Sequence, residues 1–180
     1  VDATITNFIS HLEYLGYYDS DVESEIDLHG RKVNVTYKVT LGKRYPIKDI
    51  QIELPKQGEF AGIFLTDTSA MTVRKGDFLS EASLAAESAR SADFMRNQGF
   101  FTFSKNNYFF EADTLTVPGS ALLKMTINEY TRNTSPSTAS PIRRFYIDDV
   151  TISYPKTLKI KEKILLDLNT ITPGSIYSAD

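Results

Sequence analysis

Residues 8–18 read FISHLEYLGYY, and residues 91–101 read SADFMRNQGFF. In both stretches apolar residues recur at helical spacing, and a glycine, Gly16 or Gly99, follows as a C-terminal stop. Two aromatic residues come directly after each glycine. The shared pattern predicts a helix, a stop and the start of a strand at two places in the chain.

Two further pairs of stretches repeat in the same order. RYPIKDIQI (44–52) aligns with RFYIDDVTI (144–152), and VRKGDFLSE (73–81) aligns with ITPGSIYSA (171–179). Three anchors in one order indicate an internal repeat with a period of roughly 83 to 100 residues. The repeat is the main structural signal in this sequence.

The local patterns between these anchors define the repeating unit. Alternating apolar residues predict strands over 33–39 and 47–54, and two more over 100–110 and 120–130. Loosely helical sequence follows the second strand, and Ser80 is the expected N-cap of a longer helix that runs to about Gln98. Helical spacing predicts that the buried face of this helix consists of Leu84, Ser88, Ala92 and Met95. The unit is therefore strand–helix–helix–strand–strand, an α+β arrangement.

The chain holds one whole unit and parts of two others. Residues 1–42, the first unit, are expected to supply a final helix and two strands, and residues 43–131, the middle unit, a complete set of elements. Residues 132–142 are rich in Pro, Ser and Thr and read as a linker or loop. Residues 143–180, the last unit, are expected to begin with a strand over 143–154 and to continue into a short helix.

The composition is that of an ordinary globular protein. Of 180 residues, 41% are apolar and 24% are charged, and the net charge of −3 argues against a nucleic-acid-binding protein. There is no cysteine, which excludes disulfides and zinc–thiolate sites. No apolar run approaches the roughly 18 residues that span a bilayer. The start lacks the features of a signal peptide, so the sequence reads as an internal piece of a longer chain.

Acidic residues occupy every second position from 19 to 27. A calcium loop of the EF-hand type needs Gly at its sixth position and Glu at its twelfth, but counting from Asp19 these positions hold Ser24 and Gly30. A strand also points alternate acids the same way rather than around one ion. The stripe therefore predicts a solvated strand face rather than a metal site.

No pattern typical of catalysis is present. His11 and His29 are isolated, and the adjacent Asp148 and Asp149 point to opposite faces of the expected strand. Phosphate-binding, nucleophile-elbow and zinc-protease motifs are absent. We expect no enzymatic activity, no cofactor and no metal.

A strand–helix–helix–strand–strand unit whose helix ends in LGYY or QGFF resembles a POTRA domain, and so does the KGDFLS or PGSIYS turn that precedes that helix. POTRA domains are the periplasmic repeats of the BamA/TamA-type outer-membrane protein assembly (surface antigen) family of Gram-negative bacteria. The resemblance implies a three-stranded mixed sheet packed on two helices, with the strand after the long helix at the sheet edge. It also implies a periplasmic location and a parent chain attached to an outer-membrane β-barrel.

The function that the resemblance implies is a non-enzymatic scaffold. Its open edge would bind unfolded β-barrel clients by β-augmentation, and accessory lipoproteins or periplasmic chaperones are further possible partners. The edge poor in charge is expected to be the better client strand than the acid-lined one over 19–27. The alternative is a structural spacer or a docking module for a single folded partner. The partner-binding residues expected at the edge are Phe101, Thr102, Phe103, Ser104, Lys105, Asn106, Asn107, Tyr108 and Phe109.

Overall fold

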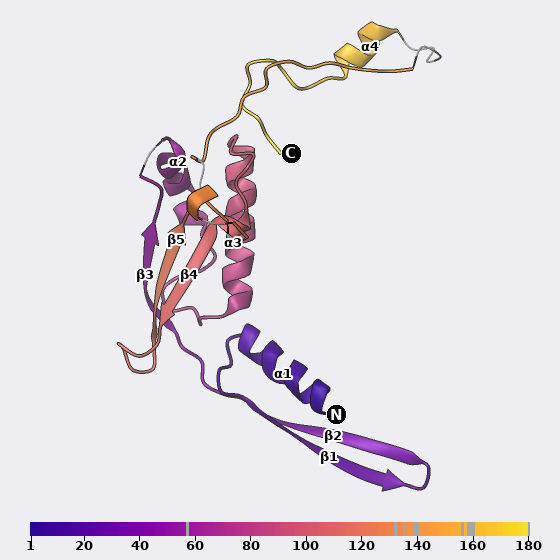
Figure 1. The fold of residues 1–180 in the computed structure, drawn as a ribbon, viewed down its shortest axis with the longest axis vertical. Coiled ribbons are helices and arrows are strands. Elements are labelled where there is room, and N and C mark those ends of the chain that lie inside the picture. Colours follow the sequence, from indigo (N-terminus) through magenta and orange to yellow (C-terminus); the bar gives the residue numbers. More distant parts are fainter. Residues whose placement is uncertain are drawn as a thin grey trace.

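The structure is a computed structural model that describes residues 1–56, 58–131, 133–134, 136–138, 141–155, 157 and 161–179. Figure 1 shows an elongated chain with a two-stranded hairpin at one end, a sheet covered by helices in the middle, and an extended segment at the other end. In chain order the elements are α1 (Asp2–Tyr14), β1 (Asp21–His29), β2 (Lys32–Thr40), β3 (Ile47–Glu53), α2 (Phe60–Asp67), η1 (Thr68–Ala70), α3 (Glu81–Asn97), η2 (Lys105–Asn107), β4 (Tyr108–Asp113), β5 (Ala121–Ile127), η3 (Pro136–Thr138) and α4 (Glu162–Asp167).

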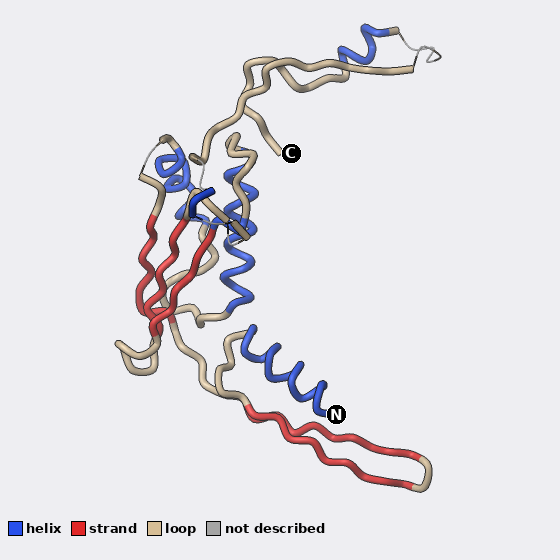
Figure 2. The backbone as a smooth tube through the Cα atoms, in the orientation of Figure 1, coloured by secondary structure: helices blue, strands red, loops and turns tan. Residues whose placement is uncertain are grey.

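The middle sheet has the strand order β3-β5-β4. β3 runs parallel to β5, and β4 runs antiparallel to it. Both α2 and α3 lie on one side of this sheet (Figure 2). The predicted three-stranded mixed sheet packed on two helices is thereby confirmed, and β4, the strand after the long helix, lies at an edge.

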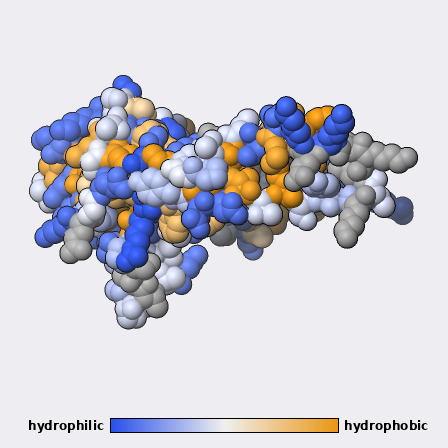
Figure 3. Space-filling view, turned by 90° about the horizontal axis from the view of Figure 1, so that it is seen from above, coloured by the Kyte–Doolittle hydropathy of each residue, from blue (hydrophilic) through white to orange (hydrophobic). Residues whose placement is uncertain are grey.

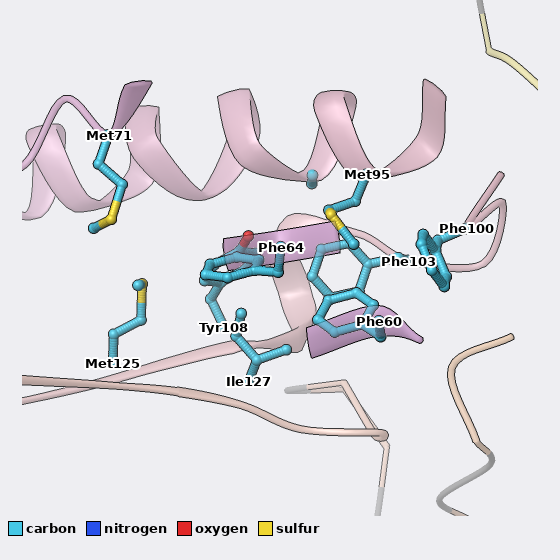
Figure 4. Packing of buried hydrophobic residues seen from close by; sticks show 10 residues of the cluster. Phe60, Phe64, Met71, Met95, Phe100, Phe103, Tyr108, Met125 and Ile127 are labelled. Atoms are coloured by element: carbon cyan, nitrogen blue, oxygen red, sulfur yellow. The ribbon is translucent and has the colours of Figure 1, made fainter. Parts of the chain in front are cut away.

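The core between helices and sheet is largely aromatic (Figure 4). The ring of Phe60 lies 5.2 Å from that of Phe100 and 4.9 Å from that of Phe103. Tyr108 is fully buried, and its hydroxyl donates to Ser91 Oγ on α3 at 2.7 Å. Burial raises the pKa of Tyr108 well above its usual value, so its hydroxyl stays protonated as this donor. The expected buried face of α3 is confirmed: Leu84, Ser88, Ala92 and Met95 are all buried.

A polar network that the sequence did not predict joins α2 to α3. The Arg90 guanidinium donates to both carboxylate oxygens of Asp67, at 3.0 and 2.7 Å, and to the carboxylate of Glu87. Glu87 is only 2% exposed and also accepts from the Thr72 amide and hydroxyl. Burial raises the pKa of Glu87, but the hydrogen bonds from Arg90 and Thr72 outweigh it and leave this pKa below its usual value.

The first unit is a helix followed by a β-hairpin with apolar side chains on one face and acidic side chains on the other. α1 packs on β1, with the ring of Phe8 5.4 Å from that of Tyr37 on β2. In the hairpin register Ile26 lies opposite Val35, and the acids point to the other face. The expected solvated acidic face is confirmed for residues 21–27, whose acids are exposed. Asp19, by contrast, precedes the strand and has a positive φ of 60°.

The sequence-derived repeat recurs in the backbone hydrogen bonds. In the middle unit Ile47 N–H donates to Asp77 O at 2.8 Å, and Gly76 N–H donates to Ile47 O at 2.8 Å. In the last unit Ile147 N–H donates to Ser175 O at 2.9 Å, and Gly174 N–H donates to Ile147 O at 2.7 Å. Both helix stops are confirmed as well, because Gly16 and Gly99 adopt φ values of 89° and 95°.

Two sequence expectations about strands are wrong. Residues 101–107 do not extend the edge strand, because 101–102 form a turn, 103–104 are irregular and 105–107 form η2. The side chains of Ser104 and Asn107 cap this short helix reciprocally, and Phe103 turns into the core instead of alternating along an edge.

The strand expected over 143–154 is also absent from the described residues. Only an isolated bridge, Tyr146 to Ile176, forms there, equivalent to the bridge from Pro46 to Phe78 in the middle unit. The described residues after 143 contain no strand that could pair with residues 143–154. Apolar side chains consequently stay exposed, Tyr146 by 56%. Seen from above, orange hydrophobic residues lie among blue hydrophilic ones over the visible face (Figure 3). The expected linker over 132–142 falls partly outside the described residues.

Candidate peptide-binding edge and unit junctions

In the part of the chain that the structure describes, β4 pairs with a strand, β5, on one side only. It pairs with β5 in an antiparallel register in which Tyr108 lies opposite Ile127. Asn128 N–H donates to Asn107 O. Residues 107, 109, 111 and 113 are therefore the ones whose backbone groups face β5 and form the hydrogen-bonded pairs with it. The backbone groups of Phe110 and Ala112 therefore point away from β5. Tyr108 N–H is used locally, by Lys105 O.

These outward groups face a groove between β4 and α3, which we call the β4 groove. It encloses about 670 Å³. One wall is the edge of β4 from Phe109 to Ala112, and the opposite wall is the first half of α3, including Leu84, Ala85 and Ser88. The Ser88 hydroxyl donates to Ala85 O at 3.0 Å, so its hydrogen is used within the helix.

The end of the groove is formed by another part of the chain. Tyr14, the last residue of α1, and Tyr18, which follows it, both line the groove together with the edge of β4. Figure 1 shows α1 ending beside the start of α3. Burial raises the pKa of Tyr18, and the carboxylates of Glu81 and Glu13 raise it further, so Tyr18 stays neutral at physiological pH.

The other edge of the sheet is less accessible to a new strand. Around Ile47 the outer side of β3 is hydrogen-bonded to the turn at Gly76 and Asp77. Further along, Lys75 forms an ion pair with Asp49 across this edge. Covered or charged edges discourage strand addition, so β4 is the better candidate.

The junction between the first and middle units is built from backbone bonds and aromatic contacts. Tyr18 and Lys43 exchange two backbone hydrogen bonds of 2.9 and 2.7 Å. The Arg44 guanidinium lies over the rings of Tyr17 and Phe78, at 4.8 and 4.0 Å from their centroids. These contacts hold the end of α1 against the turn that precedes α3.

The junction between the middle and last units uses equivalent positions. The ring of Phe101 lies 6.1 Å from that of Phe145, matching the 5.7 Å between Tyr18 and Tyr45 at the first junction. Phe145 N–H donates to Gly99 O, and Arg144 Nε donates to Gln98 O. The paired aromatics that follow each helix stop thus contribute to the joints between units.

The structure separates the nine residues expected at the edge. Only Tyr108 and Phe109 lie in β4, and Tyr108 is a core residue. Phe101 lies at the second junction, Phe103 and Asn107 are buried, and the remaining residues form the turn and η2. Lys105 and Asn106 do line the groove.

Sequence reasoning missed Phe110, Glu111 and Ala112, the groove-lining residues that follow Phe109 in β4. The available signal was the spacing Ser104–Asn107, which is typical of a capped turn and would have moved the start of the strand to Tyr108.

The described residues contain no group of three or more His, Cys, Asp or Glu side chains placed to hold a metal ion. In the same part of the chain, no helix is both long and apolar enough for a transmembrane span.

The fold was compared with solved structures. The crystal structure of POTRA domains 3–5 of BamA from Haemophilus influenzae aligns with a TM-score of 0.53, over 99% of this chain and 63% of that chain, at 14% identity. This chain has the POTRA fold. The recognition made from the repeated LGYY and QGFF stretches is confirmed at the level of fold, and the chain spans less than two thirds of that relative.

A second structure, BamA from Haemophilus ducreyi lacking POTRA domains 1–3, aligns with a TM-score of 0.42 over 71% of this chain and 23% of that chain, at 14% identity. No protein-family model matches the sequence, and no curated protein matches it.

Proposed function

We propose that this POTRA chain is part of the periplasmic, non-enzymatic scaffold of an outer-membrane protein assembly or translocation factor. The POTRA fold, found also in the BamA structure from Haemophilus influenzae, supports this proposal. The proposal includes the division of the chain into a first unit (1–42), a middle unit (43–131) and a last unit (143–180). It also includes a parent chain attached to an outer-membrane β-barrel. Unfolded barrel clients, and accessory lipoproteins or periplasmic chaperones, are its proposed partners.

The proposed activity is strand addition at β4. The observation that carries it is the outward backbone of Phe110 and Ala112 beside the β4 groove. An extended peptide gains backbone hydrogen bonds at such an edge with little demand on its sequence. That property suits clients that share only an unfolded, alternating β-strand pattern. The proposed edge is β4, residues 108–113, in place of residues 101–109.

The test is a proline at an outward position. Ala112→Pro removes an N–H that faces away from β5, so the β4–β5 ladder keeps its bonds. Ala112→Val is the matched control, because it adds bulk and keeps the N–H. A labelled 11-residue peptide that alternates phenylalanine with threonine between terminal lysines serves as the probe. Loss of one backbone hydrogen bond, about 0.5–1.5 kcal/mol, predicts binding about 2- to 12-fold weaker for Ala112→Pro.

Amide exchange of β5 establishes that both variants keep the sheet. Equal affinity of the two variants for the peptide, with the sheet intact, contradicts strand addition at β4. A Ser24→Pro variant of the acid-lined β1 compares the two units, and we expect it to weaken peptide binding less than Ala112→Pro does.

A structural spacer is the second candidate, and the matching junctions favour it. An aromatic pair at equivalent positions, Tyr18–Tyr45 and Phe101–Phe145, lies at each junction, as a spacer built from repeated units would require. Photo-crosslinking from Phe109 distinguishes the two functions. Many unfolded clients attached at this position support a peptide-binding edge, whereas one folded protein supports a dock, and none supports a spacer.

A further inference from the structure

The β4 groove is shared between two units, and this sharing suggests a selectivity that an isolated POTRA unit would lack. We propose that Tyr14 and Tyr18 of the first unit form an aromatic end wall that selects strands with an aromatic side chain facing α3 near Ala112. The inference rests on the proposed strand addition at β4. It adds the class of strand that the edge prefers.

The two tyrosines are fixed in place by different contacts. Tyr18 is held through its backbone, by the two hydrogen bonds to Lys43, and its ring packs 5.7 Å from that of Tyr45. Tyr14 ends α1 and is 40% exposed, with its ring stacked 6.2 Å from that of His11. The wall therefore has one anchored ring and one ring accessible to a ligand.

The opposite wall leaves space for a large side chain. Along the first half of α3 the groove is lined by Leu84, Ala85 and Ser88, and the last two are small. Tyr108 and Ala112 are four residues apart in β4, so their side chains lie on the same, helix-facing side of the sheet, and the acids of β4 lie on the other side. An added strand would place every second side chain on that same side, between β4 and α3.

The chemistry of this pocket favours an aromatic side chain over a charged one. The tyrosine rings supply faces and edges for aromatic pairing, which stabilises a bound aromatic side chain beyond the burial of its area. Glu81 and Lys105, two charges of opposite sign, also line the groove, so a charged side chain of either sign would gain no net attraction there. A strand that alternates aromatic with polar residues fits both features.

The test uses two peptides of the same length. One alternates phenylalanine with threonine between terminal lysines, and the other replaces each phenylalanine with alanine. Fluorescence anisotropy gives the ratio of their affinities for the 180-residue chain. We expect the wild type to favour the phenylalanine peptide by about tenfold or more, and Tyr14→Ala to reduce this ratio at least threefold while leaving the affinity for the alanine peptide unchanged.

Control variants separate selection from stability. Tyr14→Phe should keep the wild-type ratio, and Ala112→Pro should weaken both peptides by a similar factor and keep the ratio as well. Tyr18→Ala should behave as Tyr14→Ala, with Tyr18→Phe as its control, provided that the first junction stays intact by amide exchange at Lys43.

Each contrary result identifies which idea fails. If Tyr14→Ala weakens both peptides equally, or leaves the ratio unchanged, the aromatic end wall is wrong while strand addition stands. If Ala112→Pro and Ala112→Val bind both peptides equally well, strand addition at β4 is wrong, and the selectivity inferred from it is overturned too.

Discussion

The first junction depends on a glycine for two separate reasons, and a matched pair of substitutions separates them. Gly16 has a φ of 89°, and a Cβ there would lie 2.2 Å from the carbonyl oxygen of Leu79. Gly76 has a similar φ of 95°, but a Cβ there meets nothing within 4 Å. Gly16→Ala therefore combines backbone strain with a clash, whereas Gly76→Ala has the strain alone.

The expected magnitudes follow from these two terms. The left-handed backbone costs an alanine about 1–2 kcal/mol, and both variants share this cost. In Gly16→Ala the distance of 2.2 Å between the new Cβ and Leu79 O is 1.2 Å shorter than the 3.4 Å at which ordinary contact begins. The Cβ is fixed to the backbone and Leu79 O is a backbone atom, so neither can rotate away. Relieving it moves Leu79 and its turn away, which loosens Arg44 from Phe78 and Tyr17. Cation–π contacts of this exposed kind are worth about 0.5–1 kcal/mol each.

The assay measures the junction directly. Because the chain has no cysteine, spin labels can be placed on Thr36→Cys in β2 and Asp93→Cys in α3, both exposed positions. We expect Gly16→Ala to broaden the distance distribution between the labels and Gly76→Ala to leave it unchanged. Gly99→Ala should leave it unchanged too, because the atoms that a Cβ there would meet, Arg144 Cγ and Ile176 Cγ2 at 2.8 Å and Phe145 O at 3.1 Å, all lie at the second junction. Equal distributions for Gly16→Ala and Gly76→Ala would refute the reasoning.

Three further predictions concern the middle unit. Arg90→Met leaves the buried carboxylates of Glu87 and Asp67 without their cation, and should lower the free energy of unfolding by about 3–5 kcal/mol in urea titrations at pH 7. Because the folded pKa of Glu87 is depressed, its contribution to stability is present above the usual value of 4.5 and is lost as pH falls through the folded pKa. Glu87→Gln should therefore flatten the acid side of the stability profile, measured by thermal unfolding from pH 7 to pH 3. Ser104→Pro removes the N–H that donates to Asn107 Oδ1 at 3.0 Å, so it should lower the melting temperature, whereas Ala112→Pro should lower it little.

The repeat was predictable because it is local. Each helix stop needs a glycine with positive φ, and each is followed by aromatics, so Gly16 and Gly99 could be aligned without any knowledge of tertiary contacts. The N-cap at Ser80 was equally visible, and its side chain does accept from Ser83 N–H. The buried face of α3 followed from helical periodicity alone.

The site was less predictable because it depends on contacts between distant segments. The aromatic run from Phe100 to Phe110 looks like one strand, but Phe103 is drawn into the core by Phe60, 43 positions earlier in the chain. The buried ion pair between Asp67 and Arg90 is likewise invisible to any local pattern. No spacing in the sequence could show that Tyr14 would line a groove with β4.

Tyr18 takes part in both the first junction and the β4 groove, and this shared role connects the two proposals. Its backbone is bonded to Lys43, while its side chain lines the groove. A strand that packs on Tyr18 therefore stabilises the arrangement in which the two units are docked, and any change that undocks them removes part of the binding wall. Because coupling between binding equilibria is reciprocal, the factor by which docking improves affinity for an aromatic strand equals the factor by which that strand favours docking.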